Sequence, residues 1–140
     1  MNQPILRHIC KVEYCAAYHL KSAIILPAQA KALVGEPMPW QELPIVGLAS
    51  LEVTDEVENG VRIYTSKLTA TLCKSFLHPK RPSAFRLTDV QGKQYLLGTA
   101  KSPYPLISQA LSCTTDSSKG STTILSINYL SVYPLLSIGM

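Results

Sequence analysis

The dipeptide Asn59-Gly60 constrains the fold of this chain more than any other short segment. It separates residues 48–57 from residues 61–72, two runs in which apolar and β-branched residues recur. Asn-Gly is among the strongest sequence signals for a two-residue hairpin turn, because both residues tolerate positive φ angles. We therefore expect two neighbouring antiparallel strands. The apolar residues of the second run change parity part-way, which predicts a bulge or a swap of the buried face near Thr65–Lys67.

Strand and turn signals recur along the rest of the chain. Residues 84–90 and 93–98 flank Asp89-Val90-Gln91-Gly92, which suits a type I turn closed by a left-handed glycine. Residues 5–14 alternate in polarity, and residues 122–133 are rich in Thr, Ile, Tyr and Val. These four segments are predicted to be strands.

Two further segments are predicted to form short helices. In residues 27–34, Pro27 suits the first helical position and Gly35 suits the C-terminal cap. This helix is short, so it would need tertiary packing to be stable. Residues 101–113 contain spaced apolar residues after a Ser-Pro-Tyr-Pro sequence and are the second candidate.

Length and composition fit one globular domain over residues 1–140. The chain has 140 residues, of which 46% are hydrophobic. Domains commonly have about 100–150 residues, and a chain of this size buries a sizeable core without disulfides or metal. Turn signals recur about every ten residues, a spacing typical of all-β domains. The predicted fold is mainly β, a β-sandwich or barrel-like domain of antiparallel hairpins with one or two short helices.

The charged residues are few and strongly segregated. They make up 16% of the chain, where about 25% is typical. Residues 36–60 carry a net charge of −6, residues 61–101 carry +7, and residues 102–140 are neutral. Adjacent acidic and basic blocks favour two neighbouring strands that attract each other or two faces of a head-to-tail oligomer. The charge-free residues 120–140 are expected to be covered by their own sheet or by a neighbouring subunit.

No targeting segment is predicted. The apolar C-terminal stretch is interrupted by Ser, Thr, Asn and Pro134, unlike a membrane-spanning helix. The N-terminus has Arg7, His8 and Lys11 where a signal peptide has its apolar core. The expected location is cytoplasmic or virion-associated, without secretion by a signal peptide. The four cysteines form no CxxC pair and are expected to be reduced thiols.

Four residues near the N-terminus are candidate metal ligands. His8, Cys10, Cys15 and His19 place imidazole and thiol groups, which zinc prefers, within twelve residues. Their spacing differs from the C-x2-4-C knuckle of structural zinc sites. The favoured interpretation is that the cysteines are small apolar residues, and that the protein has no metal and no cofactor.

Sequence motifs for catalysis are missing. No GxSxG, HExxH, P-loop or GxGxxG sequence occurs in the chain. Cys73 with His78, or Cys10 with His19, could form a nucleophile–base pair only if the fold brings them together. We therefore expect a protein that is not an enzyme.

A basic segment at residues 74–86 is the candidate nucleic-acid contact. Lys74, Lys80, Arg81 and Arg86 alternate there with aromatic residues, a mixture found on nucleic-acid-binding surfaces. An acidic protein surface would satisfy the same cations. Nucleic-acid binding through this segment is the alternative function.

Three tyrosines are candidate partner contacts. In Pro103-Tyr104-Pro105 the prolines fix an extended backbone that holds the ring outward or packs it into the core. Tyr129 and Tyr133 lie in the predicted final strand.

The sequence Phe85-Arg86-Leu87-Thr88-Asp89-x-x-Gly92-x-x-Tyr95-Leu96-Leu97-Gly98-Thr99, followed by the tyrosine between two prolines, carries a family resemblance. Over about residues 61–105 the chain resembles small uncharacterised β-rich proteins encoded in prophage-like elements of gut bacteria. The resemblance implies a structural or assembly role, as in a phage tail or head–tail joint. It implies no catalytic residues. The expected function is a non-enzymatic assembly protein that contacts copies of itself or other assembly proteins.

Overall fold

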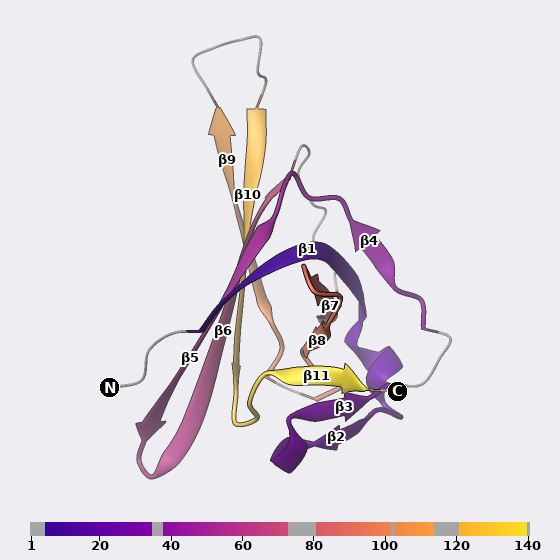
Figure 1. The fold of residues 1–140 in the computed structure, drawn as a ribbon, viewed down its shortest axis with the longest axis vertical. Coiled ribbons are helices and arrows are strands. Elements are labelled where there is room, and N and C mark those ends of the chain that lie inside the picture. The colour runs from indigo at the N-terminus through magenta and orange to yellow at the C-terminus, as the bar shows by residue number, and fades with distance from the viewer. Residues whose placement is uncertain (1–4, 35–37, 73–80, 102, 114–120, 140) are drawn as a thin grey trace.

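The structure is a computed structural model that describes residues 5–34, 38–72, 81–101, 103–113 and 121–139 (Figure 1). Regular structure in these residues is almost entirely β. The strands are β1 (Ile5–Ala16), β2 (Ile24–Leu26), β3 (Lys31–Leu33), β4 (Gln41–Leu43), β5 (Ala49–Glu58), β6 (Val61–Leu72), β7 (Ser83–Asp89), β8 (Gln94–Leu97), β9 (Leu106–Cys113), β10 (Ser121–Ser131) and β11 (Leu136–Gly139). Two short 3-10 turns, η1 (Ala17–Leu20) and η2 (Pro27–Gln29), join them.

All these strands belong to one mixed sheet. Its order is β2-β3-β11-β8-β7-β1-β5-β6-β10-β9, with β4 paired to β1. Every pairing is antiparallel except that of β11 with β3. The predicted mainly β fold is confirmed, as one continuous sheet that folds back on itself rather than two separate sheets. Within the described residues, no helix has the length and apolarity needed to cross a bilayer.

Strand β1 is where the sheet changes direction. Residues Ile5–Ile9 pair with β5, and the stretch from Ile9 to Ala16 pairs with β7. The register with β7 shifts between Ile9 and Lys11, so Cys10 is an extra residue in the strand. A bulge of this kind bends and twists a strand. In Figure 1, β1 curves from the long β5–β6 ribbon toward β7 and β8.

The two predicted turns are confirmed. Asn59 and Gly60 have φ angles of 51° and 79°, as a tight hairpin turn requires. Gly92 has a φ angle of 89° and donates its N–H to the Asp89 carbonyl at 3.0 Å. Strands β5 and β6 pair without a register shift, so no bulge lies near Thr65–Lys67. The other alternative, a swap of the buried face, is what β6 shows: Ile63 lies on the opposite face of the ribbon from the core and lines a cleft.

Both helix predictions are wrong. Residues 27–34 form η2 and then β3, and Ala30 has a φ of 51°, which ends helical geometry. The Ala30 carbonyl accepts the Ser137 N–H at 2.9 Å, which ties β11 to this segment. Residues 101–113 contain strand β9, which pairs with β10 along its whole length. Sheet pairing therefore overrides local helix propensity in both segments.

The core lies inside the fold of the sheet. Its main cluster includes the fully buried Phe85, Leu87, Leu68 and Leu125, and a second cluster surrounds Leu96 near β3 and β11. Strand β10 is paired on both sides, by β6 and by β9. Both edges of β10 are thus paired within the chain's own sheet, while Ile124 and Leu130 stay exposed on its face.

Candidate functional site

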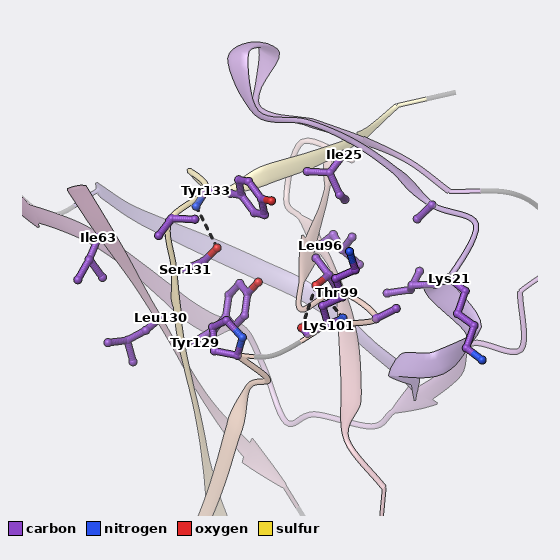
Figure 2. A pocket seen from close by; sticks show the side chains of 15 residues that line it. Lys21, Ile25, Ile63, Leu96, Thr99, Lys101, Tyr129, Leu130, Ser131 and Tyr133 are labelled. Atoms are coloured by element: carbon purple, nitrogen blue, oxygen red, sulfur yellow. Dashed lines mark hydrogen bonds between the residues drawn. The ribbon is translucent and has the colours of Figure 1, made fainter. Parts of the chain in front are cut away.

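A cleft of about 540 Å³ lies where the folded sheet brings two groups of elements opposite each other. Residues of η1, β2 and β8 form one side, and residues of β6 and β10 form the other. In Figure 2, Ile63 and Leu130 lie on one side, and Ile25 and Lys21 lie on the other. Most of the lining is apolar or aromatic, including Ile25, Ile63, Leu96, Tyr129, Leu130 and Val132.

The charged groups of this cleft are both positive. Lys21 and Lys101 line it and are exposed, and no carboxylate lines it among the described residues. Polar groups inside are bonded locally: the Ser131 hydroxyl oxygen accepts the Tyr133 N–H at 3.0 Å. Likewise the Thr99 hydroxyl donates to the Lys101 carbonyl at 3.0 Å. The cleft therefore favours an apolar ligand that carries negative charge.

The three candidate tyrosines lie at or beside this cleft. Tyr129 and Tyr133 line it, and Tyr104 follows the lining residue Pro103. The Tyr104 hydroxyl donates to the Ala100 carbonyl at 3.2 Å. Burial raises the pKa of Tyr129, so its hydroxyl stays protonated at neutral pH. The structure places Tyr129 and Tyr133 in the cleft and Tyr104 next to a residue that lines it, and what they contact in a partner stays a prediction.

Sequence reasoning missed several residues of the cleft. Leu130 is exposed between the buried Tyr129 and Ser131 of β10, and Val132, the residue after the strand, is exposed too. Successive side chains of a strand point to opposite faces of the sheet, so apolar residues at both parities of this segment could have indicated a second apolar face. Lys21 lines the cleft only because the sheet folds back on itself, and no local sequence pattern indicates that fold.

The β5–β6 turn forms a second distinctive surface, which we call the hairpin tip (residues 55–62). It projects beyond the other elements at the lower left of Figure 1. Val57 and Val61 are 57% and 48% exposed there. Glu56 and Glu58 are also exposed, and Asp55 forms an ion pair with Arg62. The tip is therefore apolar and acidic, whereas the cleft is apolar and basic.

The structure does not bring the four candidate metal ligands together. Within the part of the chain that is described, no group of three or more His, Cys, Asp or Glu side chains could hold a metal ion. Cys10 lies at the β1 bulge, is exposed, and donates its S–H to the Asp89 carbonyl at 3.4 Å. Cys15 is buried, and burial raises its pKa to about 11, against a small opposing effect of Arg86. His19 stacks on Tyr18 with ring centroids 4.1 Å apart.

These environments predict unequal thiol reactivity. The thiolate is the reactive form, so in a variant with Cys73 and Cys113 replaced by serine we expect Cys10 to react with a maleimide at pH 8 at least about tenfold faster than Cys15. Mass spectrometry of the two peptides over time measures the rates. Equal rates in the folded protein would contradict the buried, protonated state of Cys15.

Only some of the other candidate catalytic and nucleic-acid-binding residues are among those that the structure describes. Cys73, His78, Lys74 and Lys80 lie outside the described residues. The Arg81 guanidinium carbon lies 5.6 Å from the centre of the Tyr18 ring.

Arg86, the remaining cation of the basic segment, is committed to an internal contact. Its Nε and Nη2 donate to the two carboxylate oxygens of Glu13 at 2.9 and 2.7 Å. Its guanidinium also lies over the Trp40 ring, 4.9 Å from the centre. The structure thus gives Arg86 a role in joining β1 to β7, and nucleic-acid binding by the other cations of the segment stays a prediction.

Comparisons with known proteins gave no match. No protein-family model matches this chain. No curated protein matches it at a significant level, and no solved structure does so either. The roles of the cleft and the hairpin tip are therefore inferred from their own residues.

Proposed function

We propose that this chain is a non-enzymatic assembly protein that binds copies of itself, with the hairpin tip of one copy in the cleft of another. The observation that carries this proposal is the complementarity of the two surfaces. The tip exposes valines and glutamates, and the cleft exposes apolar side chains and lysines. The resemblance of residues 61–105 to prophage-encoded proteins supports the same class of function, such as a tail or head–tail component.

The apolar part of this contact has the right scale. A volume of about 540 Å³ lies within the range of roughly 300–1,000 Å³ that accommodates a drug-sized group. Val61 pairs with Glu58 across the hairpin, so a valine and a glutamate face the same way. A tip that enters the cleft therefore buries apolar surface and presents a carboxylate to the same wall.

The charged residues determine which surface of one copy faces which surface of the next. Glu56 and Glu58 of one copy would face Lys21 and Lys101 of the next. Exposed pairs of this kind contribute modestly to affinity, but they select the partner and speed association at low salt. Association should therefore weaken as ionic strength rises.

Charge reversal tests the proposal. We expect K21E/K101E and E56K/E58K each to weaken self-association about tenfold, because like charges then face each other. Mixing the two variants should restore association, since the basic tip of one then meets the acidic cleft of the other. Sedimentation velocity over a range of protein and salt concentrations measures both effects.

A matched control reverses two exposed lysines outside the cleft. K31E/K93E changes net charge by the same amount as K21E/K101E and should associate like the unchanged protein. A strictly monomeric unchanged protein at high concentration would refute the proposal, and so would a mixture that fails to recover association. Retention of DNA at low salt by the unchanged protein, lost when Lys74, Lys80 and Arg81 are replaced by glutamine, would favour the nucleic-acid alternative instead.

A further inference from the structure

A second cavity, of about 370 Å³, lies beside the segment that follows β10. Pro134 and Leu135 line it, whereas Val132 and Tyr133 of the same segment line the cleft. Three basic residues from distant parts of the chain converge on it. They are Arg7 of β1, Lys31 of β3 and Lys93 of the β7–β8 turn.

Two of these cations, Arg7 and Lys93, lie over one aromatic ring. The Arg7 guanidinium carbon lies 5.1 Å from the centre of the Tyr95 ring, and Lys93 Nζ lies 5.6 Å from it. No carboxylate is among the described residues that line the cavity. Gathering like charges around one space costs free energy, and a bound anion offsets that cost.

Arg7 adds a second, independent indication. Its Nε is buried and has no hydrogen-bond partner within the described structure. Buried donors are nearly always satisfied in native proteins, so an orphaned guanidinium N–H beside a cavity indicates a missing acceptor. A phosphate oxygen is an acceptor that suits a guanidinium especially well.

One carboxylate outside the cavity lining, Asp89, interacts with Arg7, whose charge lowers the pKa of Asp89. Asp89 Oδ1 accepts the backbone N–H groups of Gln91 and Lys93, each at 2.9 Å. Its Oδ2 accepts the Tyr95 hydroxyl at 3.2 Å. These bonds hold the carboxylate in the β7–β8 turn, and the three cations of the cavity outnumber it.

We propose that this cavity binds a small organic phosphate, with Arg7, Lys31 and Lys93 around the phosphate group. Val53, Leu135 and the ring of Tyr64 also line the cavity and offer apolar surface to the organic part of the ligand. The volume lies in the lower part of the range found for small-molecule sites. This proposal does not depend on the assembly contact, because the two sites share no lysine.

Calorimetric titration tests this site with three probes: inorganic phosphate, a nucleoside 5′-monophosphate and the matching nucleoside. We expect the monophosphate to bind, inorganic phosphate to bind more weakly, and the nucleoside not to bind. Arg7→Gln, Lys31→Gln and Lys93→Gln should each weaken monophosphate binding by about tenfold, the loss expected for one charged hydrogen bond. Lys31 and Lys93 are exposed, so their variants should fold even if Arg7→Gln does not.

Lys67→Gln is the matched control, because it removes one exposed charge that lines neither cavity. It should bind the monophosphate like the unchanged protein. The proposal is overturned if no probe binds saturably at about 10 mM. It is equally overturned if Lys31→Gln and Lys93→Gln bind unchanged, or if Lys67→Gln weakens binding as much as they do. Binding that is confined to long DNA or to anionic vesicles would also reject a small phosphate ligand.

Discussion

Replacing Glu13 with alanine is expected to destabilise the fold by about 3–5 kcal/mol. The Glu13 and Arg86 side chains are only 8% and 16% exposed, and they form a two-bond ion pair between β1 and β7. Removing the carboxylate leaves a mostly buried guanidinium without its counter-charge, and that desolvated cation is the source of the cost. Urea unfolding, followed by circular dichroism, measures the change in free energy of unfolding.

A double variant separates the ion pair from simple packing. Glu13→Leu with Arg86→Met removes both charges and keeps most of the volume. We expect it to recover much of the stability, because a buried pair replaced by apolar residues is often nearly neutral. If the double variant were as unstable as Glu13→Ala, the cost would come from lost packing rather than from an isolated charge.

Replacing Asp89 with alanine is expected to cost about 3 kcal/mol, the sum of several hydrogen bonds to a charged acceptor. The Asp89 carboxylate accepts two backbone N–H groups of the β7–β8 turn and the hydroxyl of Tyr95. For a domain of this size the loss corresponds to a fall of about 10 °C in Tm. Calorimetry at neutral pH measures it, and Val90→Ala in the same turn, whose side chain is exposed, is the matched control.

The effect of Asp89 should depend on pH. Burial alone would raise its pKa, but the N–H groups of Lys93 and Gln91, the Tyr95 hydroxyl and the charge of Arg7 outweigh burial and lower the pKa below 3.8. A carboxyl whose pKa is lower in the folded state stabilises the fold above its unfolded pKa and loses that contribution as pH falls through the folded value. The stability gap between the unchanged protein and Asp89→Ala should thus persist at neutral pH and narrow below about pH 4. A gap that stayed constant down to pH 2 would contradict this role of the ionised carboxylate.

The features that the sequence predicts correctly are local. The turn at Asn59-Gly60 needs positive φ angles at two adjacent residues, and those residues supply them. The turn at Asp89–Gly92 is similarly specified, because the aspartate bonds to N–H groups two and four residues later. Short-range hydrogen bonds and backbone preferences therefore gave the hairpins and, through them, the mainly β fold.

The features that the sequence does not predict depend on distant partners. Residues 27–34 are not helical because the Ala30 carbonyl bonds to Ser137, 107 residues away. The bulge at Cys10 has no local sequence signal, because it arises where β1 passes from pairing with β5 to pairing with β7.

The surroundings of the candidate site residues also depend on partners that are distant in the sequence. Tyr129 and Tyr133 were identified as contacts, but their neighbours Lys21 and Ile63 come from other elements. The assignment of Arg86 to a surface overlooked Glu13, which is 73 residues away in the sequence.

The parallel pairing of β11 with β3 has a consequence for how the chain reaches this structure. In the sequence, all the strands from β4 to β10 lie between β3 and β11, and β11 is synthesised after every other described strand. Pairing across such a separation requires a large loop to close, which slows folding more than it affects stability. The hairpins β2–β3, β5–β6, β7–β8 and β9–β10 are all local and can form early. The β2–β3 hairpin joins the rest of the sheet only through β11, so we expect this corner, which lines both cavities, to dock late.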